Sequence, residues 1–150
     1  MPESVIVDAS VLIALERIDL LKILCKIYKE IILPDAVVKE FGKINIDCLS
    51  VRKVESRLIN ILMKELNLGR GEAEVIALAY ETNFKALIDD LKARKIAEDL
   101  GLSISGSIGV LLKAEKLGLV KSALKKAREL KDKGFYVSDE LLDKMSKFKS

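Results

Sequence analysis

A short apolar strand is predicted at Ser4-Val5-Ile6-Val7, and it ends directly on Asp8-Ala9-Ser10. Strands of a parallel sheet that is covered on both faces read as unbroken Val and Ile runs, and ligands bind beyond the carboxyl ends of such strands. Asp8 therefore lies at the edge where an active site is expected. The alternative is that Asp8 or Ser10 caps the next helix by accepting a hydrogen bond from a backbone N–H.

The rest of the chain alternates between short apolar runs and helical patterns. Four further runs read as strands, the second of them as an edge strand: residues 30–33, 49–52, 86–88 and 102–105. Helical periodicity separates these runs, and glycines end several of the helices. This order predicts an α/β fold with a single-domain open sheet, mostly parallel, and helices on both faces. We expect one domain over residues 1–150, with a basic helical C-terminal segment from about residue 121.

Composition places the chain among compact globular proteins. Of its 150 residues, 50% are hydrophobic and 33% are charged, so the chain can bury a full core. No apolar run approaches the length of a membrane span, and the first residues lack a basic-then-apolar export signal. We therefore expect a cytoplasmic protein with no membrane contact. The glycine motifs of dinucleotide-binding and P-loop proteins are absent as well.

Residue types that are rare or absent narrow the chemistry further. Histidine is absent, which excludes Ser-His-Asp and Cys-His catalysis and the usual zinc sites. Cys25 and Cys48 have no second thiol near either of them in sequence, so we expect reduced core residues rather than a disulfide. Lys, Glu and Ile are abundant, Gln and Trp are missing, and Thr82 is the only threonine. This bias indicates a thermophilic source.

The net charge of +3 does not by itself establish binding to nucleic acid. Basic residues are concentrated between Lys121 and Lys133, in a helical context. We interpret this segment as a solvated helix face, because ordinary surface helices carry comparable charge.

Carboxylates follow two separate strands. Asp8 ends the first strand and the pair Asp89-Asp90 ends a later one, while Glu40 and Glu72 lie on helices that can lean over the same edge. Hard divalent ions such as Mg²⁺ and Mn²⁺ prefer oxygen ligands, and they activate water for phosphodiester hydrolysis without histidine. The sequence therefore predicts a Mg²⁺ or Mn²⁺ site built from carboxylates.

Four motifs in order resemble those of the PIN-domain ribonucleases, which include the toxins of VapBC-type toxin–antitoxin pairs. They are Val7-Asp8-Ala9-Ser10-Val11-Leu12-Ile13, Pro34-Asp35-Ala36-Val37-Val38-Lys39-Glu40-Phe41, the run Gly71–Ala79, and Leu87-Ile88-Asp89-Asp90 followed by Lys92–Ala97. The resemblance covers residues 4–120 and implies a PIN-like fold. It also implies that four acids act as metal ligands and catalytic residues: Asp8, Glu40, Glu72 and Asp90. Ser10 then has a supporting role.

Two positions depart from the family pattern. The third acid is Glu72, where the family commonly has Asp, and Glu74 replaces it if the helix is rotated from this interpretation. Asp89 competes with Asp90 for the fourth role. Three cations adjoin the third and fourth motifs and are candidates for binding phosphate, or are solvated charges: Arg70, Lys92 and Arg94.

The resemblance implies a metal-dependent endoribonuclease that cleaves single-stranded or loop RNA, as the toxin component of a toxin–antitoxin pair. RNA, an antitoxin peptide and a second copy of the chain are then the expected partners. Only 5% of the residues are aromatic, so we expect base stacking to contribute little. The alternative is a catalytically silent PIN-fold module with a binding or regulatory role. A phosphoacceptor domain is a third hypothesis, but its acceptor Asp and later Lys are not evident.

Overall fold

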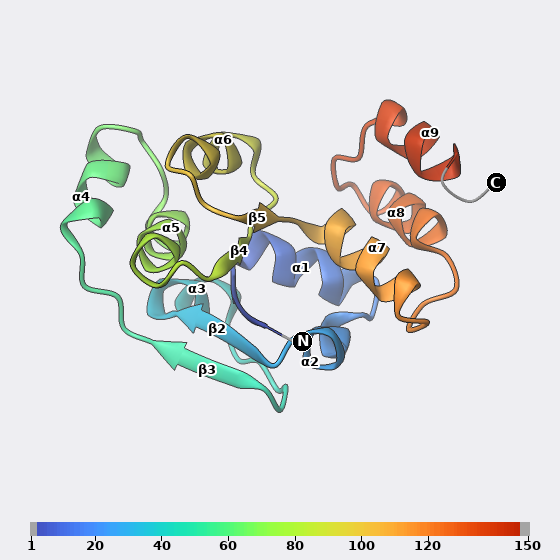
Figure 1. Ribbon diagram of the computed structural model, residues 1–150, viewed down its shortest axis with the longest axis horizontal. Helices are drawn as coiled ribbons and strands as arrows, with labels where there is room; N and C mark the ends of the chain where they lie inside the picture. Colours follow the sequence, from blue (N-terminus) through green and yellow to red (C-terminus); the bar gives the residue numbers. More distant parts are fainter. Residues whose placement is uncertain (1–2, 148–150) are drawn as a thin grey trace.

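The computed structural model describes residues 3–147, and within them the strands form one sheet in the order β3-β2-β1-β4-β5 (Figure 1). Every neighbouring pair is parallel. The strands are β1 (Ser4–Val7), β2 (Glu30–Pro34), β3 (Leu49–Arg52), β4 (Lys85–Leu87) and β5 (Ile104–Ser105). The predicted open α/β sheet is confirmed, and the run at residues 49–52 is its edge strand.

Strand register aligns the acidic residues at one edge of the sheet. Val7 pairs with Leu87, and the backbone N–H of Asp8 donates to the carbonyl of Leu87 at 3.0 Å. Asp8 therefore leaves β1 at the level where β4 ends, and Asp89 and Asp90 follow shortly after. On the other side of β1, strand β2 ends at Pro34 and leads directly into the helix that carries Glu40.

Helices fill the connections between the strands, and further helices follow the last strand. The helical segments are α1 (Ala9–Arg17), a 3₁₀ turn η1 (Leu21–Ile23), α2 (Leu24–Ile27), α3 (Asp35–Phe41), α4 (Arg57–Lys64), α5 (Arg70–Thr82), α6 (Leu91–Asp99), α7 (Ser107–Lys116), α8 (Ala123–Asp132) and α9 (Asp139–Lys147). Glycines with positive φ follow α3, α6, α7 and α8, as the sequence predicts. Helices α1, α3 and α6 start at the carboxyl edge of the sheet, close to the acidic residues.

Both faces of the central strand are covered. Val5, Ile6 and Val7 are each 0% exposed, and successive side chains of a strand point to opposite faces. Helix α5 packs on β1, β2 and β4, and it is buried at every position from Ala73 to Ala79. Burial of each large aliphatic side chain stabilises the fold by about 1.5–3 kcal/mol. The apolar core thereby holds the ends of β1 and β4 and the start of α5 in fixed relation.

The prediction of two reduced cysteines is wrong, because Cys25 and Cys48 form a disulfide. Cys25 lies in α2, which leads into β2, and Cys48 directly precedes β3. Strand β3 is the parallel neighbour of β2, and the N–H of Ile31 donates to the carbonyl of Cys48 at 2.9 Å. This pairing brings together two thiols that are 23 residues apart in sequence, which no local spacing reveals.

The basic segment after Lys121 forms α8, which packs on α7 and α9. Ala123, Ala127 and Leu130 are its buried residues, whereas Lys125 and Arg128 are exposed. No helix among residues 3–147 is long and apolar enough to cross a membrane.

Reduction of the disulfide is expected to lower the thermal stability of the protein. A cross-link that closes a loop of this length stabilises the folded state by about 3 kcal/mol in the chain-entropy model. In a domain of this size that corresponds to a decrease in Tm of roughly 6–12 °C. Calorimetry with and without a phosphine reductant measures the change. The variant with both Cys25→Ser and Cys48→Ser is the control, and an equal response of that variant contradicts the prediction.

Candidate active site

Four acidic side chains from different parts of the chain line one cavity of about 630 Å³ at the carboxyl edge of the sheet. Asp8 follows β1, Glu40 comes from the last turn of α3, Glu72 from the first turn of α5, and Asp90 from the start of α6. These are the four acids that the family resemblance assigns as ligands. The remaining lining residues are Ser10, Ile13, Ala36, Lys39, Gly69, Arg70 and Gly71.

Asp8 is 3% exposed, and only one oxygen of its carboxylate has a hydrogen-bond partner. Its Oδ2 accepts a hydrogen bond from the Ser10 hydroxyl at 3.0 Å, whereas its buried Oδ1 has no hydrogen-bond partner. Asp8 occupies the N-cap position of α1, yet its side chain makes no capping hydrogen bond, and Ser10 lies inside the helix. The capping interpretation therefore does not describe Asp8. An unpartnered buried oxygen costs about 1–3 kcal/mol, which a bound cation would offset.

The acids repel one another electrostatically. Burial raises the pKa of Asp8 to about 7; the Ser10 hydroxyl and the backbone N–H of Ala9 oppose this shift, and the charges of Glu72 and Glu40 add to it. Burial also raises the pKa of Glu72, with further contributions from the charges of Asp90 and Glu40. Carboxylates that raise the pKa of their neighbours lie close together in a poorly solvated place. This is the environment in which a divalent cation is stabilised.

Gly71 provides space that the acids need. A Cβ atom at this position would stand 3.0 Å from Glu40 Oε2 and 4.0 Å from Asp8 Oδ1. In the sequence Gly71 stands out only as part of a motif, and this role was not predicted. A signal was present, because glycine in a helix is about 1 kcal/mol less favourable than alanine and its use there indicates a close approach.

Helix α5 places Glu72 and Glu74 in different surroundings. Glu74 is 4% exposed; its Oε1 accepts from the N–H of Ala36 at 3.1 Å, and its Oε2 accepts from Arg70 Nε at 2.7 Å. It therefore joins α5 to the start of α3 and does not line the cavity. Glu72 lines the cavity, and its Oε1 accepts from the N–H of Gly69 at 3.2 Å.

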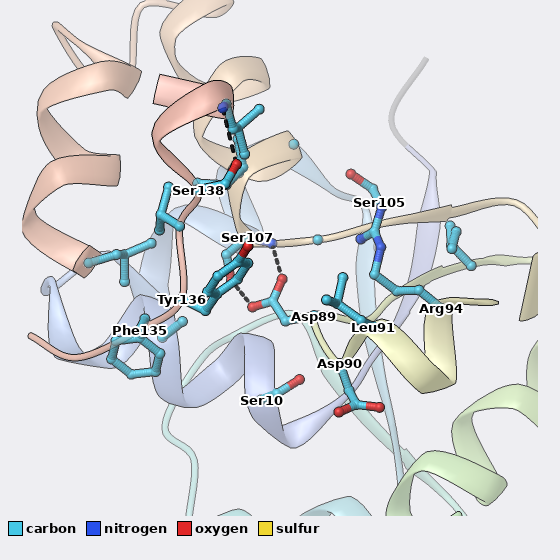
Figure 2. Close-up of a pocket in the computed structure, with 18 residues that line it drawn as sticks. Ser10, Asp89, Asp90, Leu91, Arg94, Ser105, Ser107, Phe135, Tyr136 and Ser138 are labelled. Atoms are coloured by element: carbon cyan, nitrogen blue, oxygen red, sulfur yellow. Dashed lines mark hydrogen bonds between the residues drawn. The ribbon is translucent and has the colours of Figure 1, made fainter. Parts of the chain in front are cut away.

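Asp89 and Asp90 point in different directions, as Figure 2 shows. Asp89 accepts a hydrogen bond from the N–H of Ser107 at 2.8 Å and a second from the Ser107 hydroxyl, so it fastens the end of β4 to the start of α7. Asp90 accepts from the N–H of Ala93 at 2.9 Å and lines the carboxylate cavity. The structure thus brings Asp90 together with the other three acids and directs Asp89 elsewhere.

The three cations proposed for phosphate binding lie in different places. Arg70 lines the carboxylate cavity and pairs with Glu74, with its side chain 56% exposed. Lys92 and Arg94 lie outside the cavity: Lys92 Nζ donates to the carbonyl of Asn67 at 3.3 Å, and Arg94 Nη1 donates to the carbonyl of Ile88 at 2.8 Å. Lys39, which was not predicted as a phosphate-binding residue, is an exposed lysine that lines the cavity next to Glu40.

The donor set fits a hard divalent cation. It offers carboxylate oxygens without nitrogen or sulfur, and one buried oxygen that lacks a partner. Within residues 3–147 no three acidic side chains stand in an arrangement that could hold a metal ion as they are. Glu40 is exposed, so rotation of its side chain is the simplest adjustment that would bring a further oxygen toward Asp8.

Residues 4–149 match the family model of a PIN domain, DUF3368. The match extends past the four motifs and takes in α8 and α9. A comparison with curated proteins finds no match.

Substitution of Asp8 should change the pH dependence of stability in metal-free protein. The folded state holds a proton on Asp8 up to about pH 7, whereas the unfolded chain releases it near 3.8. The wild type is therefore destabilised progressively as pH rises between these values, by at most about 4 kcal/mol. Asp8→Asn removes this penalty. We expect the Tm of Asp8→Asn minus that of the wild type to increase across this range in EDTA and then to level off.

Thermal unfolding between about pH 4 and pH 8 measures this difference. The control is Asp47→Asn, which removes an exposed carboxylate from the loop before β3. A difference for Asp8→Asn that stays constant with pH would show that the carboxylate titrates normally.

Proposed function

The chain belongs to the PIN-domain family, whose fold is generally that of nucleases, and from this premise we propose a Mg²⁺- or Mn²⁺-dependent endoribonuclease. Its substrate is single-stranded or loop RNA. The observation that carries the proposal is the buried Asp8 carboxylate, which has an unpartnered oxygen and faces three further acids across one cavity.

The residues that would hold the ion are Asp8, Glu40, Glu72 and Asp90. When bound, such an ion supplies a water of lowered pKa and neutralises charge on a phosphodiester. Three of the four carboxylates are already oriented by hydrogen bonds, from the Ser10 hydroxyl and from the backbone N–H groups of Gly69 and Ala93. Glu40 is the exposed and adjustable member.

Two cationic side chains at the cavity support binding of a phosphate group of the substrate. Arg70 and Lys39 line the same cavity as the acids, and cations in this position contact the nucleic-acid backbone without reading its sequence. Arg70 is also held in place by its 2.7 Å ion pair with Glu74. The chain can therefore position a phosphodiester next to the carboxylates.

A catalytically silent module is the second candidate function. Glu72 stands where the family commonly has Asp, and its carboxylate accepts a hydrogen bond from the N–H of Gly69 at the start of its own helix. This departure favours a protein that keeps the fold and binds a partner without turnover. Binding of Mn²⁺ separates the two candidates, because only the nuclease requires an ion at the four acids.

The toxin role, the antitoxin peptide, the homodimer and the cytoplasmic location stay predictions. They derive from the family resemblance and from composition. The nuclease proposal depends on none of them.

Removal of the Asp8 charge should abolish RNA cleavage. Substitutions of residues that only support metal ligands typically reduce activity about 10–100-fold, and we expect that range for Ser10→Ala. Asp8→Asn removes a ligand and should reduce the rate by more than about 100-fold. The assay follows cleavage of a mixed pool of single-stranded RNA with Mn²⁺, and addition of EDTA should stop it. Equal rates for the wild type and Asp8→Asn would refute the proposal, and Asp47→Asn controls for the loss of one charge.

Gly71→Ala should separate metal binding from stability. The added methyl group presses on Glu40 Oε2, an exposed side chain that can move away, so the fold tolerates the change. Alanine also favours the helix by up to about 1 kcal/mol. We expect an unchanged or higher Tm in EDTA together with weaker Mn²⁺ binding by calorimetric titration. Retention of wild-type Mn²⁺ affinity would show that Gly71 does not shape the site, and no binding by the wild type would favour the silent module.

A further inference from the structure

A second cavity, of about 790 Å³, adjoins the carboxylate cavity. Ser10 and Asp90 line both cavities, so the two lie side by side. The walls of the second cavity come from the start of α6, the junction of β5 with α7, and the segment between α8 and α9 (Figure 2). We call it the side groove. Its volume falls within the range of roughly 300–1,000 Å³ that is typical of small-molecule sites.

The side groove presents an exposed aromatic ring. Tyr136 is 81% exposed, more than any other large apolar side chain described in residues 3–147. The segment that carries it is held on both sides: the N–H of Phe135 donates to the carbonyl of Leu130 at 3.0 Å, and Val137 is 5% exposed. Ser138 then caps α9 through the N–H of Leu141 at 3.1 Å. Tyr136 is therefore a ring on a fixed backbone, with no role in the core.

The charge of the side groove disfavours phosphate. Its charged lining residues are Asp89, Asp90 and Arg94, which gives one more acid than base. Arg94 is bonded to the carbonyl of Ile88, and Asp89 accepts two hydrogen bonds from Ser107. Most of the other lining is apolar, including Leu91, which is 70% exposed. Such a surface suits a flat, neutral group that has apolar faces.

We propose that the side groove binds an unstacked nucleobase of the RNA strand, with the base stacked on the ring of Tyr136. The inference rests on the proposed function for the identity of the strand. Bases of single-stranded RNA stack on aromatic side chains, and this contact tolerates any sequence. Because the groove shares Ser10 and Asp90 with the carboxylate cavity, the bound base belongs to a nucleotide close to the phosphodiester at the acids. Tyr136 is thus a determinant of substrate position.

Equilibrium binding of a fluorescently labelled single-stranded RNA tests the inference without reference to cleavage. Anisotropy is measured in EDTA at low salt with the full chain and with Tyr136→Ala, Tyr136→Phe and Tyr80→Ala. Loss of one stacked base weakens binding about 5- to 150-fold, and we expect this increase in Kd for Tyr136→Ala. Tyr136→Phe keeps the ring and should bind like the wild type. Tyr80, which is 57% exposed on α5 and outside the groove, provides the matched control.

A series of RNAs with one abasic nucleotide locates the contact. In the wild type the abasic change should weaken binding at one position by a similar factor, and in Tyr136→Ala that position should have no further effect. Equal Kd values for the wild type and Tyr136→Ala overturn the inference, as does the absence of RNA binding by the wild type. If the groove binds a peptide and no base, the wild type and Tyr136→Ala bind RNA with equal Kd.

The outcomes for the groove and for the nuclease are independent. Tyr136-dependent binding without RNA cleavage supports the side groove and contradicts the nuclease. RNA cleavage together with RNA binding that does not depend on Tyr136 supports the nuclease and contradicts the inference about the side groove.

Discussion

The site depends on a carboxylate that ends the central strand of a buried parallel sheet. The packing of β1 and its neighbours buries Asp8 away from water. Its pKa is raised to about 7 because burial disfavours the charged carboxylate. Ser10 compensates one oxygen only. The apolar core supplies the stability that keeps this charge buried. The negative charges of the surrounding acids make the binding of a cation more favourable. Burial and mutual repulsion therefore act together to define the site.

Strand order determines which side chains can reach Asp8. With β1 between β2 and β4, the connections that leave β2 and β4 begin on either side of Asp8, and they carry Glu40 and Asp90. Helix α5 packs across the same strands, and its alanine-rich buried face lets it approach closely. That approach places Gly71 against Glu40 and directs Glu72 toward the cavity. The geometry of the four acids is thus a consequence of parallel topology.

The sequence was sufficient to predict features that depend on one short stretch of the chain, such as the end of a strand. Asp8 and the pair Asp89-Asp90 follow from apolar runs that end on acids, and the edge strand at residues 49–52 was expected from its own short run. The sequence left alternatives open, or led to a misplaced side chain, where the answer depends on the rotation of a helix or on distant packing. Glu72 and Glu74 differ only in the face of α5 that they occupy, and Asp89 differs from Asp90 only through Ser107. Lys92 and Arg94 adjoin the motifs in sequence, yet backbone carbonyls hold them outside the cavity.

The disulfide connects two predictions made from composition, the cytoplasmic location and the thermophilic source. Disulfides are rare in cytoplasmic proteins, except in those of hyperthermophiles, which are rich in them. The disulfide Cys25–Cys48 therefore agrees with the predicted cytoplasmic location only when the predicted thermophilic source holds as well. The cross-link lies where β2 and β3 begin, whereas the acids lie where β1, β2 and β4 end. It can stabilise the sheet from the edge opposite the acids and leave the carboxylate cavity unconstrained.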